Sequence, residues 1–185
     1  MIDPDAHPCP WTQRIRLVAT TALLFGLVAC AAQTDDQLRP PTPVLPGPVV
    51  MLAQVRAAGA AAPGSLEVQP LRDPGVADLR LRAEQLEAHG DVDGATSAIA
   101  QALAIQPGDP ELLQQAAEYA LYHHDWAKAA AWAKQSFDSG PKTGSLCRRN
   151  WVTLRFVAMA HADVAAMQAA TAALTACTLE PPPRY

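Results

Sequence analysis

Aromatic side chains and long apolar runs are both scarce in this chain. Only 5% of its 185 residues are aromatic although 50% are hydrophobic, and alanine makes up much of the difference. Because an alanine side chain buries little area, a core rich in alanine requires helices that approach one another closely. The run of 13 uncharged residues at 17–29 is shorter than the roughly 20 apolar residues of a transmembrane helix. These shortages predict closely packed helices and argue against a membrane span at residues 17–29.

An excess of basic residues and the common catalytic motifs are missing as well. The chain has 14 basic against 18 acidic residues and a net charge of -4. A nucleic-acid partner would need Lys and Arg clustered on one face, so we expect none. No Ser/His/Asp arrangement, phosphate-binding loop or thiol–histidine pair can be placed on the sequence. We therefore expect neither enzymatic activity nor a cofactor.

Proline divides the chain into two kinds of polypeptide, since eleven of the 17 prolines lie before residue 75. Five of them fall within residues 40–48, where they prevent helix and central strand and favour extended polyproline II. Such a segment suits a spacer. Residues 49–58 are compatible with a short helix and residues 59–74 with a loop. We expect both to be poorly ordered or loosely docked.

The N-terminal segment has the order of a secretory signal peptide. Arg14 and Arg16 precede the apolar run at 17–29, and Leu27-Val28-Ala29-Cys30 follows at its end. These four residues resemble the lipobox of bacterial lipoproteins. The resemblance implies cleavage before Cys30, a diacylglycerol on its thiol and acylation of the new N-terminus; several acyl chains make such an anchor stable. The alternative is a buried helix of the folded domain.

The same resemblance predicts where the protein resides. The residues after Cys30 are Ala31 and Ala32, and the aspartate that often retains lipoproteins in the inner membrane of Gram-negative bacteria is missing there. We therefore expect an outer-membrane lipoprotein whose domain faces the periplasm. Residues 1–29 would be the signal peptide and residues 30–75 the lipidated N-terminus and Pro/Ala-rich linker.

A period of 34 residues runs through the second half of the chain. Four positions of one segment recur in the next, and each lies 34 residues further on: Ala95, Ile99, Ala102 and Pro107 become Ala129, Ala133, Ser136 and Pro141. Asp91 and Asp125 occupy equivalent turns, where each is predicted to cap a helix N-terminus. The prolines follow the helices that they end. This pattern predicts repeated helix–turn–helix units.

Helix pairs of this length with small residues at these positions resemble the tetratricopeptide repeat (TPR). The resemblance implies an all-α, TPR-like α-solenoid of about three antiparallel helix pairs in residues 76–178, preceded by the signal peptide and the Pro-rich linker. The third pair is degenerate, with helices expected at about 145–160 and 163–177. Residues 179–185 would be an unstructured tail.

Repeats of this family bind peptides or partner proteins on the concave face formed by the first helix of each pair. Carrying the family's groove positions over to this sequence gives a candidate partner-binding groove: Arg80, Glu84, Glu87, Gln114, Glu118, Leu121, Tyr122, Arg148, Val152 and Arg155. The alternative is a solvated polar face without a ligand, since charge on a helix surface is common.

Two cysteines remain after the predicted processing, because cleavage would remove Cys9 and lipidation would use Cys30. Cys147 opens the first helix of the third pair and Cys177 closes the second, so the two lie side by side in an antiparallel hairpin. In an oxidising compartment this predicts a disulfide. Two buried free thiols are the alternative.

No metal site is predicted. His123-His124-Asp125 lies on a turn, where adjacent histidines rarely converge on one ion and no third ligand is visible. Asp91 and Asp93 lack the remaining ligands of a calcium loop. His161 is interpreted as a cap or turn residue.

Three functions remain open at this stage. The first is an outer-membrane-anchored scaffold that binds an unidentified protein or peptide partner; its architecture resembles pilotins of secretion and pilus systems and regulators of peptidoglycan enzymes. The second is an envelope enzyme or a lipoprotein that binds a small ligand or metal. The third is a structural module packed inside a larger complex.

Overall fold

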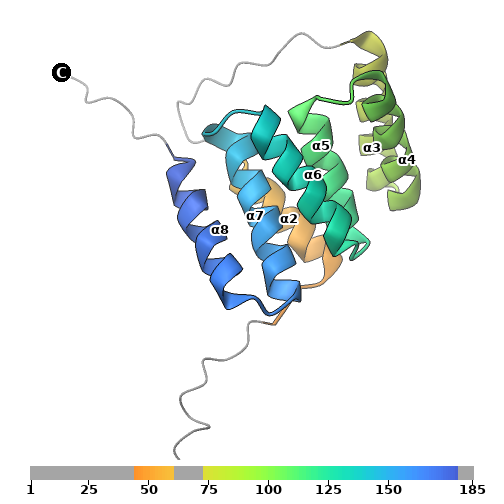
Figure 1. Cartoon of the computed structure of the whole chain (residues 1–185). Helices are drawn as coiled ribbons and strands as arrows, with labels where there is room; N and C mark the ends of the chain where they lie inside the picture. Colours follow the sequence, from red (N-terminus) through yellow and green to blue (C-terminus); the bar gives the residue numbers. More distant parts are fainter. Residues whose placement is uncertain (1–43, 61–72, 179–185) are drawn as a thin grey trace, which may run out of the picture. The chain divides into compact units, whose positions relative to one another are not determined.

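The computed structural model describes residues 44–60 and 73–178. Within these residues the fold is all-α, with seven helices, and Figure 1 shows its antiparallel pairs. The helices are α2 (Pro48–Ala58), α3 (Pro74–Ala88), α4 (Val92–Ile105), α5 (Pro110–Tyr122), α6 (Trp126–Ser139), α7 (Gly144–Ala160) and α8 (Val164–Ala176). The predicted signal peptide, Cys30 and the tail at 179–185 lie outside the described residues. Among the described residues, none of the helices is both long and apolar enough to cross a membrane.

Aspartates begin most of these helices. In five of them the aspartate before the first helical residue accepts a hydrogen bond from a backbone N–H of the first turn; the five are Asp73, Asp91, Asp109, Asp125 and Asp163. These bonds satisfy donors that have no partner inside the helix. The predicted caps at Asp91 and Asp125 are therefore confirmed.

The two helices of each pair are joined by the same kind of turn. The three turns are His89-Gly90-Asp91, His123-His124-Asp125 and His161-Ala162-Asp163, and their middle residues have φ of 83°, 59° and 53°. In each, the aspartate N–H donates to the carbonyl five residues before it, at 2.8–2.9 Å, as in a Schellman motif. The turns recur after 34 and then 38 residues. The longer second interval arises because α7 has 17 residues and α5 only 13.

Small side chains form the contacts between paired helices, as the alanine content predicts. Ala83 of α3, Ala95 and Ala102 of α4 and Ala117 of α5 are fully buried. Ala83, Ala95 and Ala102 belong to one apolar cluster that also holds Ile99 and Tyr119. Because an alanine leaves room for the neighbouring backbone, the two helices of a pair can approach closely.

The short helix α2 packs against α5 and α7. Met51 and Val55 are fully buried, in one cluster with Leu121, Val152 and Phe156. The expectation that this segment is poorly ordered or loosely docked is therefore wrong for α2. Its buried residues recur at positions 51, 52 and 55, a helical spacing that gives the helix one apolar face.

The predicted disulfide is present. Cys147 and Cys177 are bonded, with a distance of 5.6 Å between their Cα atoms. Next to the bridge, the N–H of Gly144 donates to the carbonyl of Cys177 at 2.9 Å. The bridge therefore ties the start of α7 to the end of α8, and the predicted bounds of this pair agree with the observed ones to within one residue.

Candidate functional site: a charged cavity beside α2

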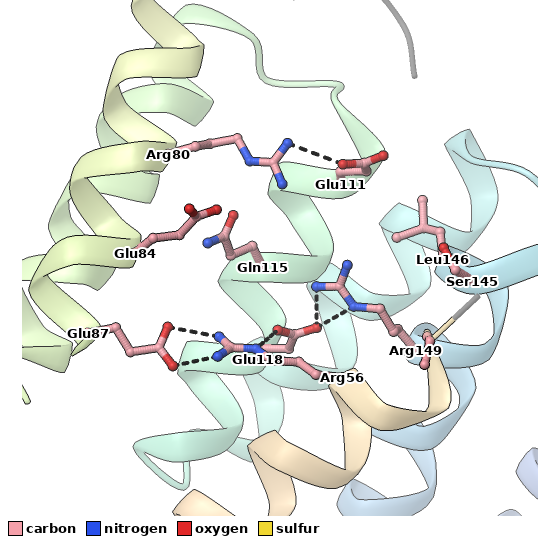
Figure 2. A pocket seen from close by; sticks show the side chains of 12 residues that line it. Arg56, Arg80, Glu84, Glu87, Glu111, Gln115, Glu118, Ser145, Leu146 and Arg149 are labelled. Carbon is pink, nitrogen blue, oxygen red and sulfur yellow. Dashed lines mark hydrogen bonds and ion pairs between the residues drawn. The ribbon is translucent and has the colours of Figure 1, made fainter. Parts of the chain in front are cut away.

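A cavity of about 450 Å³ opens between α2 and the first helices of the three pairs, α3, α5 and α7. Figure 2 shows its charged side chains reaching inward from these helices. Most of the lining is polar: Arg56, Arg80, Glu84, Glu87, Glu111, Gln115, Glu118, Ser145 and Arg149, with Gly59, Ala60 and Leu146. Four glutamates thus face three arginines in one hollow.

Glu118 is the centre of the ion pairs in this cavity. Its carboxylate is fully buried and accepts from Arg56 Nε at 3.1 Å and from Arg149 Nε and Nη2 at 2.8 Å and 2.5 Å. Gln114 Nε2 donates to the same carboxylate at 3.1 Å and to Thr153 Oγ1 at 2.9 Å. A buried carboxylate is stable only with such partners. Glu118 therefore fastens α2 and α7 to α5.

Arg56 carries the network from Glu118 to α3. Its Nη1 and Nη2 donate to the two carboxylate oxygens of Glu87 at 2.5 Å and 2.9 Å, a two-bond contact that suits the planar guanidinium. Burial alone would lower the pKa of Arg56, but the hydrogen bond to Glu87 and the charge of Glu118 raise it above its ordinary value. Arg56 therefore stays charged and links three helices.

Tyr119 holds the other side of Glu87. Its hydroxyl donates to Glu87 Oε2 at 2.9 Å. Burial and this bond raise the pKa of Tyr119 to about 12. Burial also pushes the pKa of Glu87 upward, but the hydrogen bonds from Arg56 and Tyr119 outweigh it, so this pKa lies below its ordinary value. Glu87 is therefore ionised at neutral pH.

A second, separate ion pair lies at the far end of the cavity. Arg80 Nη1 donates to Glu111 Oε2 at 3.2 Å. Glu84 and Gln115 lie between this pair and the Glu87 network, and their side chains point toward one another from α3 and α5 (Figure 2). Gln115 is 6% exposed, and its Oε1 accepts no hydrogen bond from any residue that the structure describes.

The predicted groove residues do not all line one surface. Arg80, Glu84, Glu87 and Glu118 line the cavity together. Leu121 and Val152 lie instead in the apolar cluster with α2, where they are at most 2% exposed. Gln114 is fully buried between Glu118 and Thr153.

The other predicted groove residues have structural contacts. Arg148 donates to the carbonyls of Ala58 and Ala60 at 2.6 Å and 3.1 Å, where α2 ends. Tyr122 packs against the apolar cluster of α3 and α4. Arg155 lies over the ring of Phe156, 5.8 Å from its centroid.

Sequence reasoning missed several residues of this region, among them Arg56, Glu111, Gln115, Arg149 and Phe156. The inward position of Phe156 could have been found from the sequence. If the third pair is aligned on its turn at His161 rather than on the 34-residue period, Phe156 takes the place of Glu118. Arg56 had no such signal, because nothing in the sequence shows where α2 docks.

The turn histidines have local partners. His124 stacks on Trp126, with centroids 4.9 Å apart, and His123 Nε2 lies 3.6 Å from Asp93 Oδ1. In residues 44–60 and 73–178 no three His, Cys, Asp or Glu side chains gather as a metal site would require.

Comparison with known proteins gives no relative. No family model matches the chain, and no curated protein or solved structure is similar to it. The functional argument therefore depends on the sequence signals and on the geometry of the cavity.

Proposed function

We propose that this chain is an outer-membrane-anchored periplasmic lipoprotein whose TPR-like α-solenoid binds a protein partner in envelope, pilus or secretion assembly. The anchor is Cys30, and the proline-rich spacer holds the domain away from the membrane surface. The three helix pairs and their recurring turns support the TPR-like description. The proposed binding function is supported by one observation above all: an open, charged cavity lies where the first helices of all three pairs meet.

The predicted groove has one half covered by α2 and one open, polar half. The half formed by Leu121 and Val152 is filled by α2, whose Met51 and Val55 share their apolar cluster. A partner that keeps α2 in place therefore contacts the polar half, where Arg80, Glu84, Glu87 and Glu111 are found. Charged and amide side chains there favour a polar segment of a partner rather than an apolar one.

A site-specific crosslink tests this binding function in intact cells. A photo-reactive benzoylphenylalanine replaces Ala60, which lines the cavity and is exposed, or Ala100, an exposed residue of α4 that does not line it. We expect one protein adduct of defined mass from position 60 and none from position 100. An adduct from position 100 alone would place the partner elsewhere and contradict the proposal.

The anchor has its own test. Changing Cys30→Ser should move the protein from the membrane fraction to the soluble periplasmic fraction or leave an uncleaved precursor, because the thiolate is the group that accepts the lipid. Palmitate labelling that persists in the variant would contradict lipidation at Cys30.

A further inference from the structure

One glutamate of the cavity has no partner among the residues that the structure describes. Arg80 is paired with Glu111, Arg56 with Glu87 and Glu118, and Arg149 with Glu118. The fourth glutamate, Glu84, has no ion pair or hydrogen bond to any residue that the structure describes. Among the glutamates that line the cavity, Glu84 is therefore the one that can take a further cationic partner.

A second acceptor without a donor lies beside it. Gln115 Oε1 is buried and accepts no hydrogen bond within the described part of the chain, while the amide of Gln115 interacts with the Tyr119 hydroxyl. Figure 2 shows Gln115 and Glu84 pointing toward one another from facing helices. A buried acceptor without a donor is unfavourable, and a group that brings a donor recovers the lost free energy. Arg80 Nε is a buried donor without an acceptor among the described residues, but the guanidinium of Arg80 already donates to Glu111 through Nη1.

We propose that the space between Glu84 and Gln115 binds an alkylammonium group, supplied by a lysine side chain of the protein partner. Glu84 is its counter-ion and Gln115 Oε1 accepts a hydrogen bond from it. An ammonium has three donors on a compact head, which suits two acceptors on opposite walls. Glu84 is exposed, so its side chain can move to admit the incoming group. This inference names the partner's chemistry and thus rests on the proposed function.

A coupling reaction reads out the contact without knowledge of the partner. The purified full-length chain in detergent is treated with a water-soluble carbodiimide and Nα-acetyl-lysine methylamide. The carbodiimide activates a carboxylate, the lysine amine attacks the activated carbonyl, an amide bond forms, and the carbodiimide leaves as a urea carrying the former carboxylate oxygen. We expect labelling at Glu84 to exceed that at Asp78 by about tenfold, as one charge-assisted hydrogen bond accounts for. Asp78 is the matched control, because it is an exposed residue of α3 that does not line the cavity.

One variant and one competing amine separate the outcomes. Gln115→Leu, with its fold checked by circular dichroism, should reduce Glu84 labelling to the level of Asp78. Equal labelling of Glu84 and Asp78 in the native sequence would overturn the proposal. Preferential labelling by putrescine over the lysine derivative would show a site for free diamines and overturn the lysine assignment.

A final crosslinking experiment uses the partner itself. Carbodiimide treatment of cell envelopes should join Glu84 to a lysine of the protein that the photo-crosslink at position 60 captures, whereas Glu84→Gln should lose that bond and Asp78→Asn should keep it. A photo-crosslink without the bond at Glu84 would refute the lysine contact and leave the scaffold function intact. If neither forms but Glu84 is still labelled selectively in the purified chain, the scaffold function fails and the ammonium site stands.

Discussion

Replacing Glu118 with glutamine removes the negative charge on which Arg56 and Arg149 converge, while the size of the side chain is kept. The fully buried carboxylate accepts bonds from Arg56 Nε, from two nitrogens of Arg149 and from Gln114. Removing one partner of a buried ion pair costs about 3–5 kcal/mol. The side chains of Arg56 and Arg149 remain 40% and 21% exposed, so water replaces part of the lost contact. We therefore expect Glu118→Gln to lower the free energy of unfolding by about 2–3 kcal/mol.

The effect is measured by chemical and thermal denaturation followed by circular dichroism at the helix band. For a chain of this size the expected loss lowers Tm by about 10 °C. Asp78→Asn is the control, since Asp78 is an exposed residue of α3 that does not line the cavity and its change should leave the transition unchanged. If the free energy of unfolding of Glu118→Gln lies within about 0.5 kcal/mol of the native value, the ion pairs contribute no more than exposed ones do. The network then does not hold α2 and α7 to α5.

Three further predictions follow from single features. The hydroxyl of Tyr119, whose pKa is raised to about 12, stabilises the fold fully below pH 10, and this contribution should disappear between pH 10 and 12; a stability–pH curve of Tyr119→Phe should lack that step. Ala162→Gly should raise the free energy of unfolding by about 1 kcal/mol because alanine is unfavourable at φ 53°, whereas Ala100→Gly in the exposed part of α4 should lower it by a similar amount. Replacing Cys147 and Cys177 together by serine should lower the free energy of unfolding by about 2–4 kcal/mol in urea denaturation, and an unchanged midpoint would contradict a bridge in the isolated protein.

The helix pairs were predictable because local chemistry specifies them. Asp91 and Asp125 begin helices, and Pro107 and Pro141 follow their ends, so the 34-residue period alone placed four helices. The third pair was located, but its register was wrong for Arg148 and Arg155. The 34-residue period assumes helices of equal length, whereas α7 is one turn longer than α5 and its inward positions lie four residues further along the chain. The position of the turn at His161 shows this shift.

The half of the predicted groove that α2 fills could not be predicted. Whether Met51 and Val55 cover Val152 depends on contacts between residues about 100 positions apart, and such contacts leave no periodic pattern in the sequence. Arg56 is an example: its bonds to Glu87 and Glu118 span 31 and 62 residues. The sequence indicates which side chains lie on the inner face of a helix, but it does not indicate which segment packs against that face.

The position of α2 has a consequence for the order of folding. Each of the three helix pairs is built from contacts close in sequence, which form quickly. The docking of α2 instead joins residues as far apart as Arg148 and Ala58, 90 positions along the chain, and its binding surface is incomplete until α7 has formed. The first of the described helices to be synthesised is therefore the last to be buried. Until then its Met51 and Val55 remain open to other apolar segments, so early folding is the step at which this protein is most exposed to aggregation.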